Sequence, residues 1–198
     1  GAHHAGVHAH LAAAQAAGHF KDEIVTVDGV DADGCIRPDT TVEGLSGLKP
    51  AFSATGTVTA GTSSPLTDGA AATLVCSAEY AREHNLTPLA VIKSMAINGC
   101  DPDVMGLGPI GATRKALKRA GLEMGDIDIV EINEAFASQS MACINDLGMD
   151  ISRVNLDGGA IALGHPLGAT GARITGKAAA LLKREGKKYA LSTQCIGG

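Results

Sequence analysis

TGARITGKAAALLKREGKKYALSTQC, residues 170–195, decides the fold class because a helix-like pattern is followed closely by a strand-like one. Ile174, Ala178 and Leu181 recur at the spacing of one helix face, and Gly186 is placed to end the helix. The apolar run that follows is typical of a buried strand. The stretch therefore predicts a helix that ends before Gly186 and packs flat against a sheet.

The same alternation of strand-like and helix-prone segments extends upstream. Apolar segments predict strands at 68–77, 89–97, 127–133 and 189–195, and helix-prone segments predict helices at 8–18, 78–85, 113–120, 134–146 and 170–185. This order predicts an α/β fold with a mixed, mostly parallel sheet and helices on both faces. A hinge at Leu86-Thr87-Pro88 divides the chain into residues 1–85 and 86–198.

Composition excludes several classes of partner. The net charge is -5 without a basic block, and aromatic residues make up 3% of the chain, so nucleic acid is not an expected partner. No apolar run is long enough to span a membrane and no secretory leader opens the chain, so a soluble compartment is expected. The five cysteines lack zinc spacing, and His4 and His8 have no carboxylate or thiol partner in the pattern, so no metal is expected.

Asn133 is the first of three candidate functional residues. It follows the apolar run that ends at Ile132 and precedes a helix-prone segment. Asparagine is a strong helix N-cap, so one interpretation is that Asn133 only starts the helix. The other is functional, because α/β folds collect their sites at the carboxyl ends of strands, where an amide can orient a water.

His165 is the second candidate and lies in the glycine-rich loop GGAIALGHPLGATG, residues 158–171. The glycines permit close approaches and deliver the chain to the positive end of the following helix. A lone histidine is often structural. One held between Gly164 and Pro166 in such a loop is better placed to act as a base or as an oxyanion donor.

Cys195 is the third candidate and ends the strand-like run before Ile196 and Gly197. A thiol at the carboxyl end of a strand, followed by glycine N–H groups, has the parts of a reactive cysteine beside an oxyanion hole. The alternative is an ordinary buried cysteine before a turn.

These motifs together resemble thiolases. The resemblance rests on NEAFA at 133–137, GGAIALGHPLGATGAR at 158–173 and QCIGG at 194–198, with TVTAGTSSPLTDGAAA at 57–72 similar to the segment before the second half of that family. It implies a thiolase-like fold in which residues 1–85 end the N-terminal domain, with part of the coenzyme A-binding loop region, and residues 86–198 form the C-terminal domain.

The resemblance also implies an activity. Thiolases of the acetyl-CoA acetyltransferase and 3-ketoacyl-CoA thiolase type are acyltransferases of fatty acid metabolism, including β-oxidation. They cleave 3-ketoacyl-CoA by thiolysis or condense two acyl-CoA molecules, and they need coenzyme A thioesters but no further cofactor. The resemblance further implies a homo-oligomer, a dimer or a tetramer, in the cytoplasm or, in a eukaryote, in an organelle matrix.

Four residues match catalytic positions of the family. Cys195 matches the cysteine that exchanges a proton at the α-carbon of acetyl-CoA, and His165 matches the histidine that activates a separate nucleophilic cysteine. Asn133 matches the residue that positions a water in the same oxyanion hole as His165. The N–H of Gly197 matches a donor of a second oxyanion hole.

Two further residues match the coenzyme A surface. Ser64 matches a serine near the pantetheine arm, and Arg37 matches a residue at the nucleotide end. Metal ligands are not implied.

The nucleophilic cysteine of the family lies in the first half of a chain about twice this long. Cys35, Cys76, Cys100 and Cys143 fall in no matching motif, so none is assigned as the nucleophile. The sequence is therefore expected to be truncated at both ends and to need a complementary N-terminal half. Two alternatives stay open, a related condensing enzyme of the same fold and a non-catalytic acyl-CoA-binding fragment.

Overall fold

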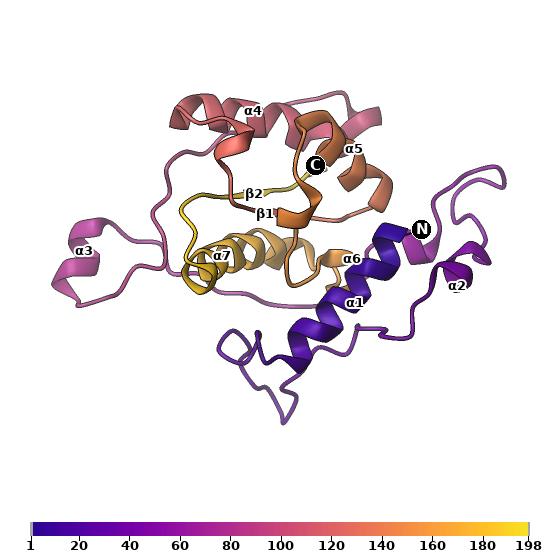
Figure 1. Ribbon diagram of the computed structural model, residues 1–198, viewed down its shortest axis with the longest axis horizontal. Helices are drawn as coiled ribbons and strands as arrows, with labels where there is room; N and C mark the ends of the chain where they lie inside the picture. Colours follow the sequence, from indigo (N-terminus) through magenta and orange to yellow (C-terminus); the bar gives the residue numbers. More distant parts are fainter. Residues whose placement is uncertain (1, 198) are drawn as a thin grey trace.

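A computed structural model describes residues 2–197, with side chains from residue 6 onward. Its elements in chain order are shown in Figure 1. The α-helices are α1 (Ala2–Ala16), α2 (Val42–Ser46), α3 (Ala78–Glu83), α4 (Gly108–Ala120), α5 (Ala137–Leu147), α6 (Ala160–Leu163) and α7 (Leu167–Glu185), and the strands are β1 (Ile129–Ile132) and β2 (Ala190–Thr193). Short 3-10 helices occur at Ala60–Thr62, Pro102–Leu107, Met124–Asp126 and Ile151–Arg153.

The strands β1 and β2 form a parallel pair between two helical layers. Ile129 lies opposite Ala190 and Ile132 lies opposite Thr193. In Figure 1, α7 lies on one side of the pair, and α4 and α5 lie on the other. This is the predicted α/β arrangement, with parallel pairing and helices on both faces.

Alternation along β1 divides its residues between the two layers. Val130 and Ile132 belong to a buried apolar cluster with Cys143 and Ile144 of α5. Glu131 and Asn133 have the opposite parity and therefore face α7. On its α7 side β1 thus carries Glu131 and Asn133 beside the buried Ile129, whereas its α5 side is apolar.

The helix predicted over 170–185 is confirmed at its end and begins one turn earlier, at Leu167. Gly186 has φ 62°, the left-handed conformation that closes a helix. By contrast, α5 begins at Ala137 with Phe136 as its cap, so the interpretation of Asn133 as a helix cap is wrong. The Asn133 N–H instead continues the sheet and donates to the Thr193 carbonyl over 3.0 Å.

The strands predicted at 68–77 and 89–97 are wrong for the described residues. Both segments lack regular secondary structure, and neither belongs to a sheet. Their apolar side chains are exposed, with Leu74 at 74% and Ile97 at 89%. A strand is stable only when a neighbour accepts and donates its ladder hydrogen bonds, and the described part of the chain provides no such neighbour for either segment.

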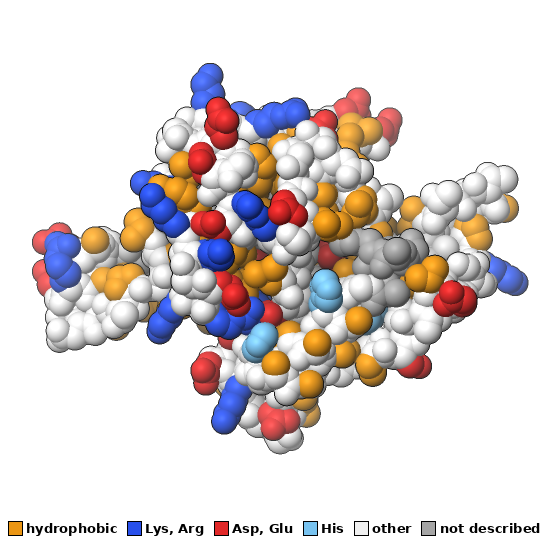
Figure 2. All heavy atoms as spheres, in the orientation of Figure 1, with side chains coloured by type: hydrophobic (Ala, Val, Ile, Leu, Met, Phe, Trp, Pro, Cys, Tyr) orange, Lys and Arg blue, Asp and Glu red, His pale blue; other side chains and the backbone are white. Residues whose placement is uncertain are grey.

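The N-terminal helix α1 packs against α6 through a second apolar cluster. Val7 and Leu11 of α1 contact this cluster with Ile161 and Ala162. The segment between α1 and the first 3-10 helix is mostly irregular and exposed. Figure 2 shows Lys and Arg side chains mixed with Asp and Glu over one face of the molecule rather than gathered into a basic patch. Among the described helices, none is long and apolar enough to cross a membrane.

Candidate active site

The carboxyl ends of β1 and β2 meet at one edge of the parallel pair. Asn133 directly follows β1, and its N–H bonds to Thr193, the last residue of β2. Cys195 lies two residues beyond Thr193. Gln194 lies against the first turns of α7, because a Cβ on Gly171 would be 3.3 Å from Gln194 Nε2. Two of the three predicted residues, Asn133 and Cys195, therefore belong to one edge.

The Asn133 side chain is fully buried without a hydrogen-bond partner. Its relative exposure is 0%, and neither Oδ1 nor Nδ2 has a partner among the described residues. Both a donor and an acceptor are consequently available here to a water or to a substrate oxygen.

Glu134 joins β1 to the glycine-rich loop. Its carboxylate accepts the Ile161 N–H at 3.2 Å and a hydrogen bond from Asn155 Nδ2 at 2.8 Å. A Cβ on Gly159 would overlap this carboxylate, so glycine is required there. Asn155 also pairs with the backbone of Ile132, accepting its N–H at 2.9 Å and donating to its carbonyl at 3.0 Å. The loop before His165 is thus fixed to the strand that carries Asn133.

His165 is half-buried at the end of this loop. Gly164, with φ 93°, precedes it, and a side chain on Gly164 would overlap Thr67. His165 Nδ1 lies 2.7 Å from Thr170 Oγ1 in the first turn of α7. Burial, followed by the charge of Arg173, lowers the pKa of His165, which favours a neutral imidazole. A neutral ring can accept a proton, as a general base must.

Cys195 is buried, with 6% relative exposure. Burial is the main cause that raises the pKa of its thiol, and the neighbouring Cys100 adds to the effect. The protonated form is therefore favoured, which suits a proton donor better than a resting nucleophile. Gly197 is exposed beyond it, and Gly198 of the QCIGG motif lies outside the described residues.

The two predicted coenzyme A-surface residues are placed differently. Ser64 lies beside the segment that follows Asn133, since its N–H donates to the Ala135 carbonyl at 3.0 Å and its hydroxyl donates to the same oxygen at 3.3 Å. Arg37 is exposed on the long loop, where its N–H donates to His8 Nδ1 at 3.2 Å. The described contacts bring Ser64, but not Arg37, to the candidate site.

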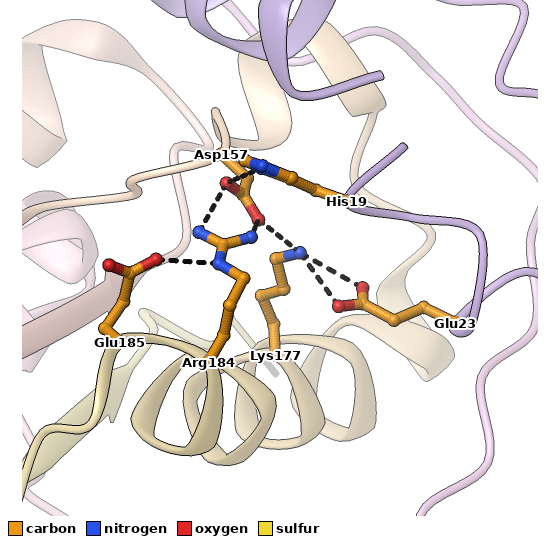
Figure 3. A network of polar contacts seen from close by, with 6 residues as sticks. All are labelled: His19, Glu23, Asp157, Lys177, Arg184 and Glu185. Atoms are coloured by element: carbon orange, nitrogen blue, oxygen red, sulfur yellow. Dashed lines mark hydrogen bonds and ion pairs between the residues drawn. The ribbon is translucent and has the colours of Figure 1, made fainter. Parts of the chain in front are cut away.

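A charged network holds the residue that precedes the glycine-rich loop (Figure 3). Asp157 lies 2.6 Å from both Lys177 and Arg184 of α7 and accepts a hydrogen bond from His19 Nδ1 at 3.0 Å. Lys177 also contacts Glu23 at 2.9 Å. Burial alone would raise the pKa of Asp157, but the hydrogen bonds from Arg184, Lys177 and His19 hold it well below its usual range. The loop is thereby anchored at its start by an ionised carboxylate.

Three residues that support the site were not singled out from the sequence. They act through hydrogen bonds to the candidate residues or to the backbone beside them, and they are Thr170, Glu134 and Asn155. The position of Glu134 next to Asn133 was a usable signal. Asn155 had no signal in the periodicity, because its partners are set by the tertiary fold. Thr170 lies only five residues after His165, in the same motif, and this proximity was a usable signal.

Comparison with known proteins defines the class to which this fold and site belong. The family described as "Thiolase, C-terminal domain" matches residues 86–198, and the family described as "Thiolase, N-terminal domain" matches residues 4–79. The chain belongs to the thiolase family.

Two curated proteins illustrate how similar this chain is to its relatives. A 3-ketoacyl-CoA thiolase of Cronobacter sakazakii is 57% identical over 93% of this chain and 51% of its own length, and one of Vibrio vulnificus is 55% identical over 96% of this chain and 52% of its own length. The chain thus spans about half the length of these curated relatives.

Two solved structures have the same fold as this chain over the part that it covers. Human mitochondrial 3-ketoacyl-CoA thiolase in complex with CoA superposes with a TM-score of 0.92 and 42% identity, over 99% of this chain and 50% of that one. The Bacillus anthracis acetyl-CoA acetyltransferase gives a TM-score of 0.91 and 41% identity, over 97% of this chain and 51% of that one. The expected thiolase-like fold is confirmed.

Proposed function

We propose that this chain supplies the proton-transfer and oxyanion-binding part of a thiolase that acts on 3-ketoacyl-CoA. The observation that carries the proposal is the shared edge of β1 and β2, where an unpartnered Asn133 amide and the Cys195 thiol lie at adjacent strand ends. Glu134 ties the loop that carries His165 to the same strand.

In the cleavage direction, His165 takes the proton of a nucleophilic thiol, and the thiolate attacks the 3-keto carbon. The bond between the α- and β-carbons then breaks, and its electron pair passes to the acetyl-CoA enolate. Cys195 gives its thiol proton to the α-carbon of this enolate and becomes a thiolate. The Cys195 thiolate then takes the proton of an incoming coenzyme A thiol, and the coenzyme A sulfur attacks the acyl carbon to form a new thioester. The nucleophilic cysteine leaves as a thiolate and recovers its proton from His165.

The remaining groups of the site would stabilise oxyanions. The Asn133 amide would hold a water that, with protonated His165, donates to one thioester oxygen, and the Gly197 N–H would donate to a second. Ser64 would border the pantetheine arm of coenzyme A and Arg37 its nucleotide end. The substrates are coenzyme A thioesters, without a metal or a further cofactor.

The partner in this proposal is a complementary N-terminal thiolase half that brings the nucleophilic cysteine. The unpaired extended segments 68–77 and 89–97 support it, because their exposed backbone and apolar side chains suit strand addition. Residues 1–85 would then complete the N-terminal domain and residues 86–198 the C-terminal one. A dimer or tetramer in the cytoplasm or an organelle matrix completes the proposal.

The test compares the chain alone with the chain assembled with an N-terminal thiolase half. The chain alone is expected to give no thiolysis of acetoacetyl-CoA, and robust turnover by it would overturn the assignment of the nucleophile to the partner. In the assembly, Cys195→Ala is expected to abolish carbon–carbon bond formation yet still permit acyl-enzyme formation, seen by intact mass.

Normal condensation by Cys195→Ala would rule out its role in proton transfer. An assembly that binds acyl-CoA without acylation would favour the non-catalytic alternative.

A further inference from the structure

Thr170 places a fully buried hydroxyl beside the candidate base. Its relative exposure is 0%, so water does not reach it. Its Oγ1 lies 2.7 Å from His165 Nδ1 and 3.0 Å from the Pro166 carbonyl oxygen. The described residues offer this hydroxyl no other hydrogen-bond partner.

The single hydroxyl hydrogen of Thr170 can serve only one of these two contacts as donor. The Thr170 hydroxyl donates this hydrogen to the Pro166 carbonyl oxygen at 3.0 Å, an oxygen that also accepts the backbone N–H groups of Ala169 and Thr170. Threonine in a helix commonly makes this bond to the carbonyl four residues earlier. Oγ1 must therefore accept from the imidazole, and His165 Nδ1 must carry a hydrogen.

We propose that Thr170 is a positioning residue that fixes one neutral tautomer of His165, with the proton on Nδ1 and the lone pair on Nε2. The inference deepens the proposed function and rests on the role of His165 as the base. With this tautomer, Nε2 receives the proton of the nucleophilic thiol and then donates it as a hydrogen bond to the thioester oxygen. Thr170 accepts from Nδ1 in both protonation states, so the ring need not turn between the two steps.

The surroundings of His165 favour the neutral imidazole that this tautomer requires. His165 is partly desolvated, and Arg173 of α7 opposes a second positive charge, so the pKa of His165 is lowered. A neutral imidazole has one N–H, and the partner of that N–H decides which nitrogen is the base. Thr170 is that partner in this fold.

The first test reads the tautomer directly and does not depend on activity. Nitrogen-15 NMR of the histidine rings of this chain, with His165 assigned from its absence in His165→Gln, is expected to show Nδ1 protonated at neutral pH. Thr170→Ser should keep that signature. Thr170→Val, which has a similar shape but cannot accept, should shift the ratio of tautomers by about tenfold, the size expected for one net hydrogen bond.

A wild-type ring protonated on Nε2, or an unchanged ratio in Thr170→Val, overturns the inference. If Thr170→Val fails to fold by thermal melting, the wild-type and Thr170→Ser spectra still decide it.

The second test measures acylation in the assembly with an N-terminal thiolase half. Thr170→Val is expected to slow acyl-enzyme formation by roughly 10- to 100-fold, as for partial loss of a general base, and Thr170→Ser should restore most of the rate. Equal acylation rates in Thr170→Val and the wild type contradict the inference. A wild-type assembly without activity whose His165 ring is nevertheless protonated on Nδ1 supports the inference and counts against the proposed function.

Discussion

Glu131 is a buried acid in a strand whose other face is apolar. It is 1% exposed, its Oε1 has no partner among the described residues, and burial raises its pKa to about 8 despite the nearby charges of Arg173 and Lys177. An acid that keeps its proton in the folded state but loses it near pH 4.5 when unfolded makes folding less favourable as the pH rises.

Glu131→Gln is therefore expected to change how stability depends on pH. The wild type should lose free energy of unfolding between about pH 5 and pH 8, by up to about 1.4 kcal/mol per pH unit from this group, while Glu131→Gln should lack that contribution. Urea unfolding across this window measures the difference. Glu79→Gln, at an exposed position of α3, is the control and should behave like the wild type. Parallel curves for Glu131→Gln and the wild type would show that Glu131 ionises normally.

At the scale of elements, the contact of α7 with the start of the glycine-rich loop depends on Asp157. The carboxylate is 3% exposed, and Lys177 beside it is 7% exposed. Removing one partner of a buried ion pair leaves the other charge uncompensated, which costs about 3–5 kcal/mol. The remaining contact of Lys177 with Glu23 favours the lower end of that range.

Asp157→Ala is thus expected to lower the free energy of unfolding by about 3 kcal/mol at neutral pH, as measured by urea denaturation. Asp146→Ala removes an exposed ion pair with Arg114 and should cost less than about 1 kcal/mol. Because the pKa of Asp157 is lowered by folding, its contribution is present above the pKa of an unfolded aspartate and is lost as the pH falls below it. Similar losses in the two variants would mean that the network adds no more than a surface pair.

Sequence periodicity predicted the elements whose stability is local. The helix that ends before Gly186 is an example. The apolar runs around Ile129 and Ala190 also indicated strands, although the pairing of these strands joins residues far apart in sequence. It failed where neighbours decide: segment 89–97 has the composition of a strand but no pairing partner in the described chain. Cap preference also misled at Asn133, because the backbone continues the sheet there and α5 begins only at Ala137. The bond between Thr170 and His165 joins residues only five apart, but it depends on how the loop turns into α7, which no periodicity rule contains.

At the scale of the whole molecule, the exposed segments 68–77 and 89–97 allow a prediction of how the chain assembles with its partner. Hydrogen exchange of backbone amides in 68–77 and 89–97 should be fast in the chain alone, since the described structure gives them no sheet hydrogen bonds. Addition of an N-terminal thiolase half should slow that exchange by at least about tenfold, the effect of one net hydrogen bond. Amides of α7, already bonded within the helix, serve as the control. Unchanged exchange in both segments would argue against strand addition as the mode of assembly.

The pairing of β1 with β2 also has a consequence for biosynthesis. Every hydrogen bond between these strands joins residues far apart in sequence, and β2 is the last described element of the chain. Contacts of this kind form late, after the cost of closing a long loop is met. During translation, the edge of β1 that pairs with β2 stays without its sheet hydrogen bonds until β2 has left the ribosome. A ribosome that stalls before Ala190 would therefore present an incomplete sheet edge, the type of surface that chaperones and proteases detect.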